Sequence, residues 1–152
     1  MPLVGIVIGS KSDLDDMKAT TDILDSLGVS YELSVISAHR TPERAREYGL
    51  SAEGRGIEVI LAAAGGSAAL PGVMSSWSIL PVIGIPLTSS DMNGVDSLYS
   101  IAQMPPGIPV ACVSIGSWGT RNAAYLAASI LSIKHPEIRS SYNDYRDKLA
   151  SG

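Results

Sequence analysis

The residues best suited to chemistry stand side by side in the stretch Ser37-Ala38-His39-Arg40-Thr41-Pro42. An apolar run, Tyr31 to Ile36, precedes them, and the sequence from Thr41 is typical of a helix start, with Thr41 as N-cap and Pro42 in the first turn. His39 and Arg40 are therefore predicted on a strand-to-helix turn, which in an open parallel sheet lies at the edge that binds ligands. His39 can carry a proton near neutral pH, and Arg40 offers the donor fork that a phosphate prefers. A plain helix-capping turn with a solvated basic pair is the alternative.

A second turn with suitable chemistry is Gly9-Ser10-Lys11-Ser12-Asp13, which follows the apolar run Leu3 to Ile8. Its two serine hydroxyls and its backbone N–H groups at a helix N-terminus would form a phosphate cradle. Asp13 could accept hydrogen bonds from a sugar diol or cap the helix, and serines before helices are also common caps. The motif by itself leaves binding and capping open.

A third candidate is the small-residue loop Ala63 to Gly72, which contains the pair Gly65-Gly66. Because it has no Cβ, this pair lets the backbone approach a flat ligand closely, and it would equally suit a tight turn between strand and helix. The chain carries no GxGxxG, no Walker A sequence and no Asp/Glu pair at a strand end. These features argue against a dinucleotide, an ATP motor and a metal-phosphate site.

Hydrophobic patterning supplies the framework that these turns need. Continuous β-branched runs predict strands buried on both faces, as in a parallel sheet, and apolar residues at helical spacing predict helices between them. Strands are expected at 3–8, 31–36, 57–62, 81–85 and 108–115, and helices at about 14–27, 42–55, 73–78, 95–103, 123–134 and from 136 onward. This alternation favours one domain over residues 1–152, a three-layer α/β sandwich with a C-terminal helix. Its five-stranded parallel sheet would have the flavodoxin-like order 2-1-3-4-5.

The loops that follow the five strands all fall on one edge of the predicted sheet. Besides the three described above, they are Pro86-Leu87-Thr88-Ser89-Ser90 and Ile115-Gly116-Ser117-Trp118-Gly119. All are small, polar and rich in glycine or serine, a character that independent loops would not share if they only turned the chain. The five loops together favour a ligand site at the strand ends.

Composition argues against several classes of function. The chain has 152 residues, 45% hydrophobic and 17% charged, which is typical of a compact globular protein. A net charge of −4 without a Lys/Arg cluster argues against a nucleic-acid partner, and one Cys with two His leaves little for a zinc site. No apolar run reaches the roughly 20 residues of a membrane span, so we expect a soluble, cytoplasmic protein without a secretory signal. Cys112 is expected to be a buried reduced thiol.

Three stretches together are specific enough to indicate a family: GSKSD from Gly9, SAHRTPER from Ser37, and GVDSLYSIAQMPPGIPV from Gly94. In these, and from Val4 to about Leu131, the chain resembles the 5-(carboxyamino)imidazole ribonucleotide mutase family, also called the aminoimidazole ribonucleotide carboxylase catalytic subunit. The resemblance implies an enzyme of purine biosynthesis that moves a carboxylate from the exocyclic nitrogen to the ring carbon of aminoimidazole ribonucleotide. It also implies the sandwich fold, a homo-octamer, and neither metal nor organic cofactor.

The same resemblance implies roles for particular residues. His39 would be the acid/base that moves a proton as the carboxylate changes place. The ribonucleotide would be bound by residues of the first three turns: Ser10, Ser12, Asp13, Ser37, Arg40, Ala64, Gly65, Gly66 and Leu70. The partners would be this ribonucleotide, carbon dioxide and further copies of the chain, with no nucleic acid and no membrane.

The chain departs from the family pattern beside the predicted binding loops. Ala69 stands where the family carries a second active-site histidine, and Trp77, Trp118 and Arg121 stand at positions usually filled otherwise. We expect the lost imidazole to be replaced by another donor, from Ser67, Ser75 or the Trp77 indole. The departures leave two alternatives open. One is a family paralogue that carboxylates, decarboxylates or cleaves another heterocyclic ribonucleotide, and the other is a non-enzymatic flavodoxin-like binding module.

Overall fold

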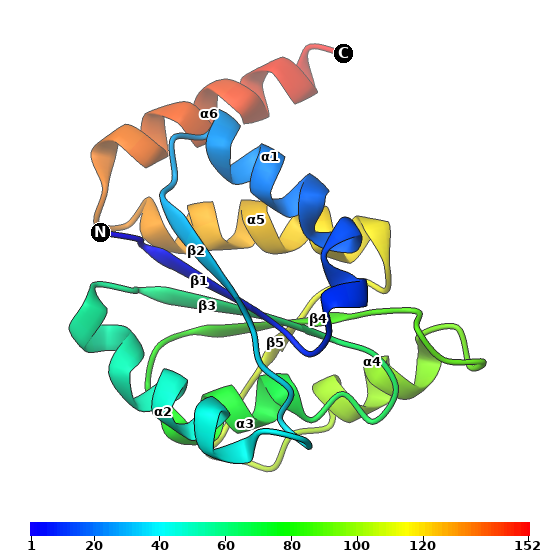
Figure 1. Ribbon diagram of the computed structural model, residues 1–152. Coiled ribbons are helices and arrows are strands. Elements are labelled where there is room, and N and C mark those ends of the chain that lie inside the picture. Colours follow the sequence, from blue (N-terminus) through cyan, green and yellow to red (C-terminus); the bar gives the residue numbers. More distant parts are fainter.

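A computed structural model of the protein describes residues 1–152 and is built on a five-stranded parallel sheet (Figure 1). The strand order is β2-β1-β3-β4-β5, which confirms the flavodoxin-like order predicted from the sequence. The strands are β1 (Val4–Ile8), β2 (Tyr31–Val35), β3 (Val59–Ala64), β4 (Val82–Pro86) and β5 (Ala111–Cys112). Because all strands run the same way, the five loops that follow them meet at one edge.

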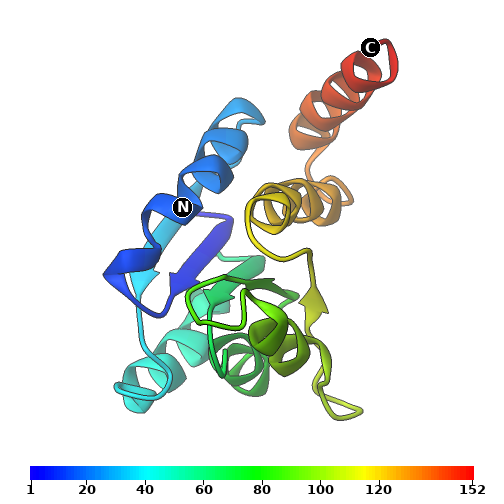
Figure 2. The same ribbon diagram turned by 90° about the vertical axis from the view of Figure 1, so that its right-hand side faces the viewer.

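Helices cover both faces of the sheet, so the molecule has three layers (Figures 1 and 2). On one face lie α1 (Lys18–Ser26) and α5 (Ser117–Leu131), with α6 (Pro136–Ala150) packed outside α5. On the other face lie α2 (Pro42–Ala52), α3 (Leu70–Trp77) and α4 (Val95–Ala102). The three short 3-10 helices are Lys11–Asp13, Asp15–Met17 and Glu53–Arg55.

The three central strands, β1, β3 and β4, are buried on both faces, which explains why they are continuous apolar runs. Along β1, Ile6 and Ile8 face the layer of α1 and α5, whereas Val7 faces the layer of α2 and α3. Gly5 also points toward the second layer, where a Cβ would collide with the Tyr48 hydroxyl. These alternating contacts divide the core into two hydrophobic clusters and hold the strand ends rigidly in register.

Several predicted boundaries are wrong at the ends of elements. The first helix opens as 3-10 turns and becomes regular only at Lys18. The fifth strand is Ala111–Cys112 rather than 108–115, because Pro109 has no N–H to donate and the strand lies at the sheet edge, paired with β4 alone. The next helix begins at Ser117, so Trp118 belongs to a helix and not to a loop.

The alanine-rich part of α5 is buried within the chain. Ala123, Ala124, Ala127 and Ala128 are fully covered by the sheet layer. The helix therefore uses its face of small side chains to pack closely on the strands. No helix of the chain has the length and apolar character needed to cross a membrane.

Candidate functional site

A cavity of about 290 Å³ opens at the carboxyl ends of β1, β2 and β3. It lies at the switch point between β1 and β3, where the order in which the chain adds strands to the sheet changes direction. Open α/β sheets bind ligands at such a point. Its size suits a small ligand at the lower end of the usual range. The lining consists of Gly9, Ser10, Ser12, Asp13, Ser37, Ala38, His39, Arg40, Ala64, Gly65, Ala68, Ala69, Leu70 and Ser89.

The turn after β1 places two hydroxyls and one carboxylate in the cavity. Ser10 is the N-cap of the first 3-10 helix, and its Oγ accepts hydrogen bonds from the Ser12 N–H at 3.4 Å and the Ser12 hydroxyl at 3.0 Å. Asp13 is only 6% exposed. Burial raises the pKa of Asp13, and the charge of Asp16 raises it further. A hydrogen bond with the Ser10 backbone lowers this pKa by less. Because its burial is poorly compensated within the chain, this carboxylate favours a ligand that brings hydroxyl donors.

The turn after β2 is organised around Ser37. Its Oγ accepts a hydrogen bond from the Arg40 N–H at 3.2 Å, and its carbonyl accepts from the Thr41 N–H at 2.8 Å and the Thr41 hydroxyl at 2.9 Å. Thr41 therefore stands at the N-cap position of α2 without capping it, because its hydroxyl points back to Ser37. Pro42 is in the first turn of α2, as predicted. These contacts fix the backbone that carries His39 and Arg40.

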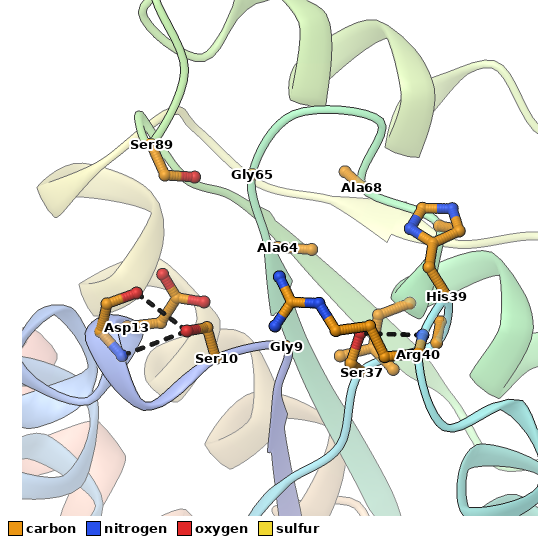
Figure 3. Close-up of a pocket in the computed structure, with 14 residues that line it drawn as sticks. Gly9, Ser10, Asp13, Ser37, His39, Arg40, Ala64, Gly65, Ala68 and Ser89 are labelled. Carbon is orange, nitrogen blue, oxygen red and sulfur yellow. Dashed lines mark hydrogen bonds between the residues drawn. The ribbon is translucent and has the colours of Figure 1, made fainter.

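The side chains of His39 and Arg40 both line the cavity and are exposed to solvent. Figure 3 shows the Arg40 guanidinium reaching in toward Ala64, with His39 on the opposite side from Ser10 and Asp13. No carboxylate lies within 4.0 Å of the Arg40 guanidinium, so its charge is not neutralised within the chain. The arrangement puts an anion-binding group between a hydroxyl-rich end and an imidazole.

The loop between β3 and α3 forms the apolar wall of the cavity. Ala64, Ala68, Ala69 and Leu70 present small or aliphatic side chains there. Ala68 has a φ of 37°, in the left-handed region that residues with a Cβ rarely adopt, and its N–H donates to the Gly65 carbonyl at 3.1 Å. Strained backbone of this kind is concentrated at functional sites. The smooth wall that results can lie against a flat heterocycle.

The structure brings together every residue that the sequence analysis assigned to the site except Gly66, which does not line the cavity. Gly66 instead has a φ of 60°, so it serves the turn. Sequence reasoning gave no role to Gly9, Ala38, Ala68 and Ser89. The sequence indicated the loop that carries Ser89 as one of the five at this edge, but it did not distinguish Ser89 from Ser90.

The departures from the family pattern do not gather in the cavity, apart from Ala69. Trp118 and Arg121 line a separate surface pocket with Asn122, Tyr125 and Tyr145. The Trp77 ring lies under the Arg46 guanidinium, 5.0 Å from its centroid, between α2 and α3. These three side chains therefore do not shape the cavity, because α3 and α5 carry both tryptophans away from it.

None of the three replacement donors expected for Ala69 lines the cavity. The Ser75 hydroxyl donates to the Pro109 carbonyl at 2.7 Å, and Trp77 is held by its contact with Arg46. Ser67 is exposed, and its carbonyl accepts from the Ser100 hydroxyl. The wall at Ala69 is therefore apolar.

Fold and cavity together define a flavodoxin-like α/β protein whose site suits a phosphorylated small molecule with a flat ring. Residues 3–151 of this chain match the sequence model of the AIR carboxylase family. The N5-carboxyaminoimidazole ribonucleotide mutase of Pyrococcus abyssi is 57% identical over 98% of this chain and 84% of that protein. The mutase of the same name from Thermotoga maritima is 54% identical over 98% of this chain and 86% of that protein.

A solved structure shows the same likeness in three dimensions. The crystal structure of Treponema denticola PurE superposes with a TM-score of 0.86 at 32% identity, covering 99% of this chain and 93% of that one. The protein described above belongs to the AIR carboxylase family.

Proposed function

We propose that this chain is a mutase of purine biosynthesis that converts N5-carboxyaminoimidazole ribonucleotide into its ring-carboxylated isomer. The name that its relatives carry, over nearly their full length, supports this reaction. The observation that carries the proposal within the chain is the single cavity that joins a buried carboxylate, an unneutralised guanidinium, an imidazole and an apolar wall.

The cavity offers a place for each part of the ribonucleotide. The Ser10 and Ser12 hydroxyls and the Arg40 guanidinium bind the phosphate, as a charge-assisted site would. Asp13, which is only 6% exposed as a residue and lines the cavity, accepts hydrogen bonds from the ribose hydroxyls. The imidazole ring of the substrate lies against the wall formed by Ala64 and Leu70.

His39 is the proton carrier in this proposal. Its imidazolium protonates the exocyclic nitrogen as the N–C bond to the carboxylate breaks, which releases carbon dioxide and leaves the neutral amine. The electron-rich ring carbon then attacks carbon dioxide, and the new C–C bond leaves an extra proton on that carbon. His39 takes this proton back, so the reaction has no net proton change. Positioning and one proton transfer are all that the protein must supply.

Two further parts of the proposal concern assembly and location. Assembly as a homo-octamer is supported by the family resemblance, and a place in the cytoplasm by the purine-biosynthesis relatives. Light scattering at micromolar concentration measures the assembly, and a monomer would contradict it.

Isotopic labelling tests the reaction directly. Purified protein is mixed with N5-carboxyaminoimidazole ribonucleotide labelled at the carboxylate, and the label is followed by carbon NMR. We expect the label to appear on the ring carbon of the product. Decarboxylation without transfer, or no change, would refute the proposed reaction.

Ala69 supports one alternative substrate class. Because this position is apolar and none of Ser67, Ser75 and Trp77 lines the cavity, the site suits a related heterocyclic ribonucleotide with fewer acceptors at the Ala69 wall. Turnover of such an analogue above that of N5-carboxyaminoimidazole ribonucleotide would favour this paralogue function.

A further inference from the structure

Four hydroxyl side chains line the cavity, and only one of them has no hydrogen-bond partner within the chain. Ser10 and Ser12 are bonded to each other, and Ser37 accepts from the Arg40 N–H. Ser89, from the loop after β4, makes no side-chain hydrogen bond, and Figure 3 shows its hydroxyl directed toward Gly65 at the rim of the cavity. Its donor and both of its lone pairs are available to a ligand.

The position of Ser89 is matched to a glycine on the neighbouring loop. A Cβ added at Gly65 would coincide with the Ser89 hydroxyl and would lie 3.0 Å from the Ser89 Cβ. Gly65 does not have a positive φ, so its backbone conformation does not require glycine. With Ser89 in this rotamer, its hydroxyl occupies the space that a side chain at Gly65 would need.

The loop that carries Ser89 is held in place by contacts that leave this hydroxyl out. The adjacent Ser90 hydroxyl donates to Asp96 at 2.6 Å and accepts from the Met92 N–H at 3.2 Å. The buried Ser97 hydroxyl donates to the Leu87 carbonyl at 2.9 Å. These bonds tie both sides of the loop to α4, so Ser89 is presented at the cavity at little further entropic cost on binding.

We propose that Ser89 is a substrate-binding residue that hydrogen bonds the ribose-phosphate part of the nucleotide. This inference rests on the proposed function. In Figure 3, Ser89 lies on the same side of the cavity as Ser10 and Asp13, and His39 lies on the other side. The hydroxyl therefore contacts the part of the substrate that does not react, and its loss affects binding rather than chemistry.

The test compares Ser89→Ala with wild type and with Thr88→Val, which removes a hydroxyl from the same loop that does not line the cavity and makes no hydrogen bond within the chain. One neutral hydrogen bond corresponds to about 2- to 12-fold in affinity. We expect Ser89→Ala to raise KM for N5-carboxyaminoimidazole ribonucleotide by this factor with kcat retained, and Thr88→Val to leave KM unchanged. An unchanged KM in Ser89→Ala, or an equal rise in both variants, would overturn the assignment.

A paired substitution tests the fit between the two loops. Gly65→Ala should impair substrate binding strongly, because the new methyl group collides with the Ser89 hydroxyl. In Gly65→Ala/Ser89→Gly the nearest atom left is the Ser89 nitrogen at 3.4 Å, so KM should return to that of Ser89→Gly. Failure of this rescue would show that the two positions are not matched.

The outcome for Ser89 can be separated from that for the proposed function. If wild type fails to turn over the substrate, the proposed reaction is refuted, and calorimetric binding of aminoimidazole ribonucleotide still compares wild type with Ser89→Ala. Equal Kd values would then overturn the role of Ser89, and the absence of any binding to wild type would overturn both.

Discussion

Replacement of Arg40 by alanine should separate the binding of phosphate from the binding of the rest of the substrate. The guanidinium lines the cavity, and no carboxylate lies within 4.0 Å of it, so its donors are free for an anion. A charge-assisted hydrogen bond contributes roughly 1.5–3 kcal/mol, about 10- to 150-fold in affinity. We expect Arg40→Ala to weaken the binding of the nucleotide by this factor. Binding of the corresponding nucleoside should hardly change, because the nucleoside has no phosphate for Arg40 to contact.

The assay is titration calorimetry with aminoimidazole ribonucleotide and its nucleoside at fixed ionic strength. Arg44→Ala is the matched control, since it removes the same charge from the beginning of α2 but does not line the cavity. The screening length is about 10 Å at moderate salt, so the control should change the nucleotide Kd little. Equal losses of affinity for nucleotide and nucleoside in Arg40→Ala would refute a role for Arg40 in phosphate binding. Equal losses of nucleotide affinity in Arg40→Ala and Arg44→Ala would show a general effect of charge instead of a direct contact.

The other predictions concern the proton carrier, the apolar wall and an ion cluster away from the site. His39→Asn should lower kcat by about 100- to 10,000-fold while the nucleotide still binds, and near-normal turnover would exclude His39 as the acid/base. Ala69→His should leave turnover of N5-carboxyaminoimidazole ribonucleotide unchanged if wild type is already fast, and a large gain would favour the paralogue function. Burial acts to raise the pKa of Glu58, but hydrogen bonds from Lys134 and His135 outweigh it and lower this pKa below the ordinary 4.5. The ionised Glu58 therefore stabilises the fold above pH 4.5, and this stabilisation is lost as the pH falls through the lowered pKa. Glu58→Gln should therefore cost about 1 kcal/mol or less at neutral pH in urea unfolding, and the difference should vanish in acid.

The arrangement of the sheet was predictable because its central strands, β1, β3 and β4, are continuous apolar runs buried on both faces. Both faces of the apolar strand Val4–Ile8 must be covered, and a parallel sheet between two layers of helices provides this cover. The crossover rules then leave few orders for five strands, and the order with the switch point beside β1 is the one found. The turns that contain Ser10 and His39 follow directly from this topology.

Details that depend on single contacts were not predictable. The shortening of β5 depends on Pro109 and on its place at the sheet edge, which the apolar run from Ile108 to Ile115 conceals. The hydroxyl of Thr41 could have capped α2, and only the conformation of the turn shows that it bonds Ser37 instead. Ser89 could not be singled out from Ser90, because neighbouring serines in one loop have the same chemistry until their partners are known.

The departures from the family pattern show why nearness in sequence is a poor measure of nearness in space at this edge. Trp77 lies eight residues beyond Ala69, yet it is at the end of α3 and packs against Arg46, away from the cavity. Trp118 lies in the first turn of α5, close to the loop that follows β5, yet it lines a separate pocket with Tyr125 and Tyr145. Because α3 and α5 both run away from the strand ends, only their first residues can reach the ligand. The question of which ribonucleotide the cavity prefers therefore concentrates on one of its walls, the one that Ala69 lines, and Ala69→His is the variant that addresses it.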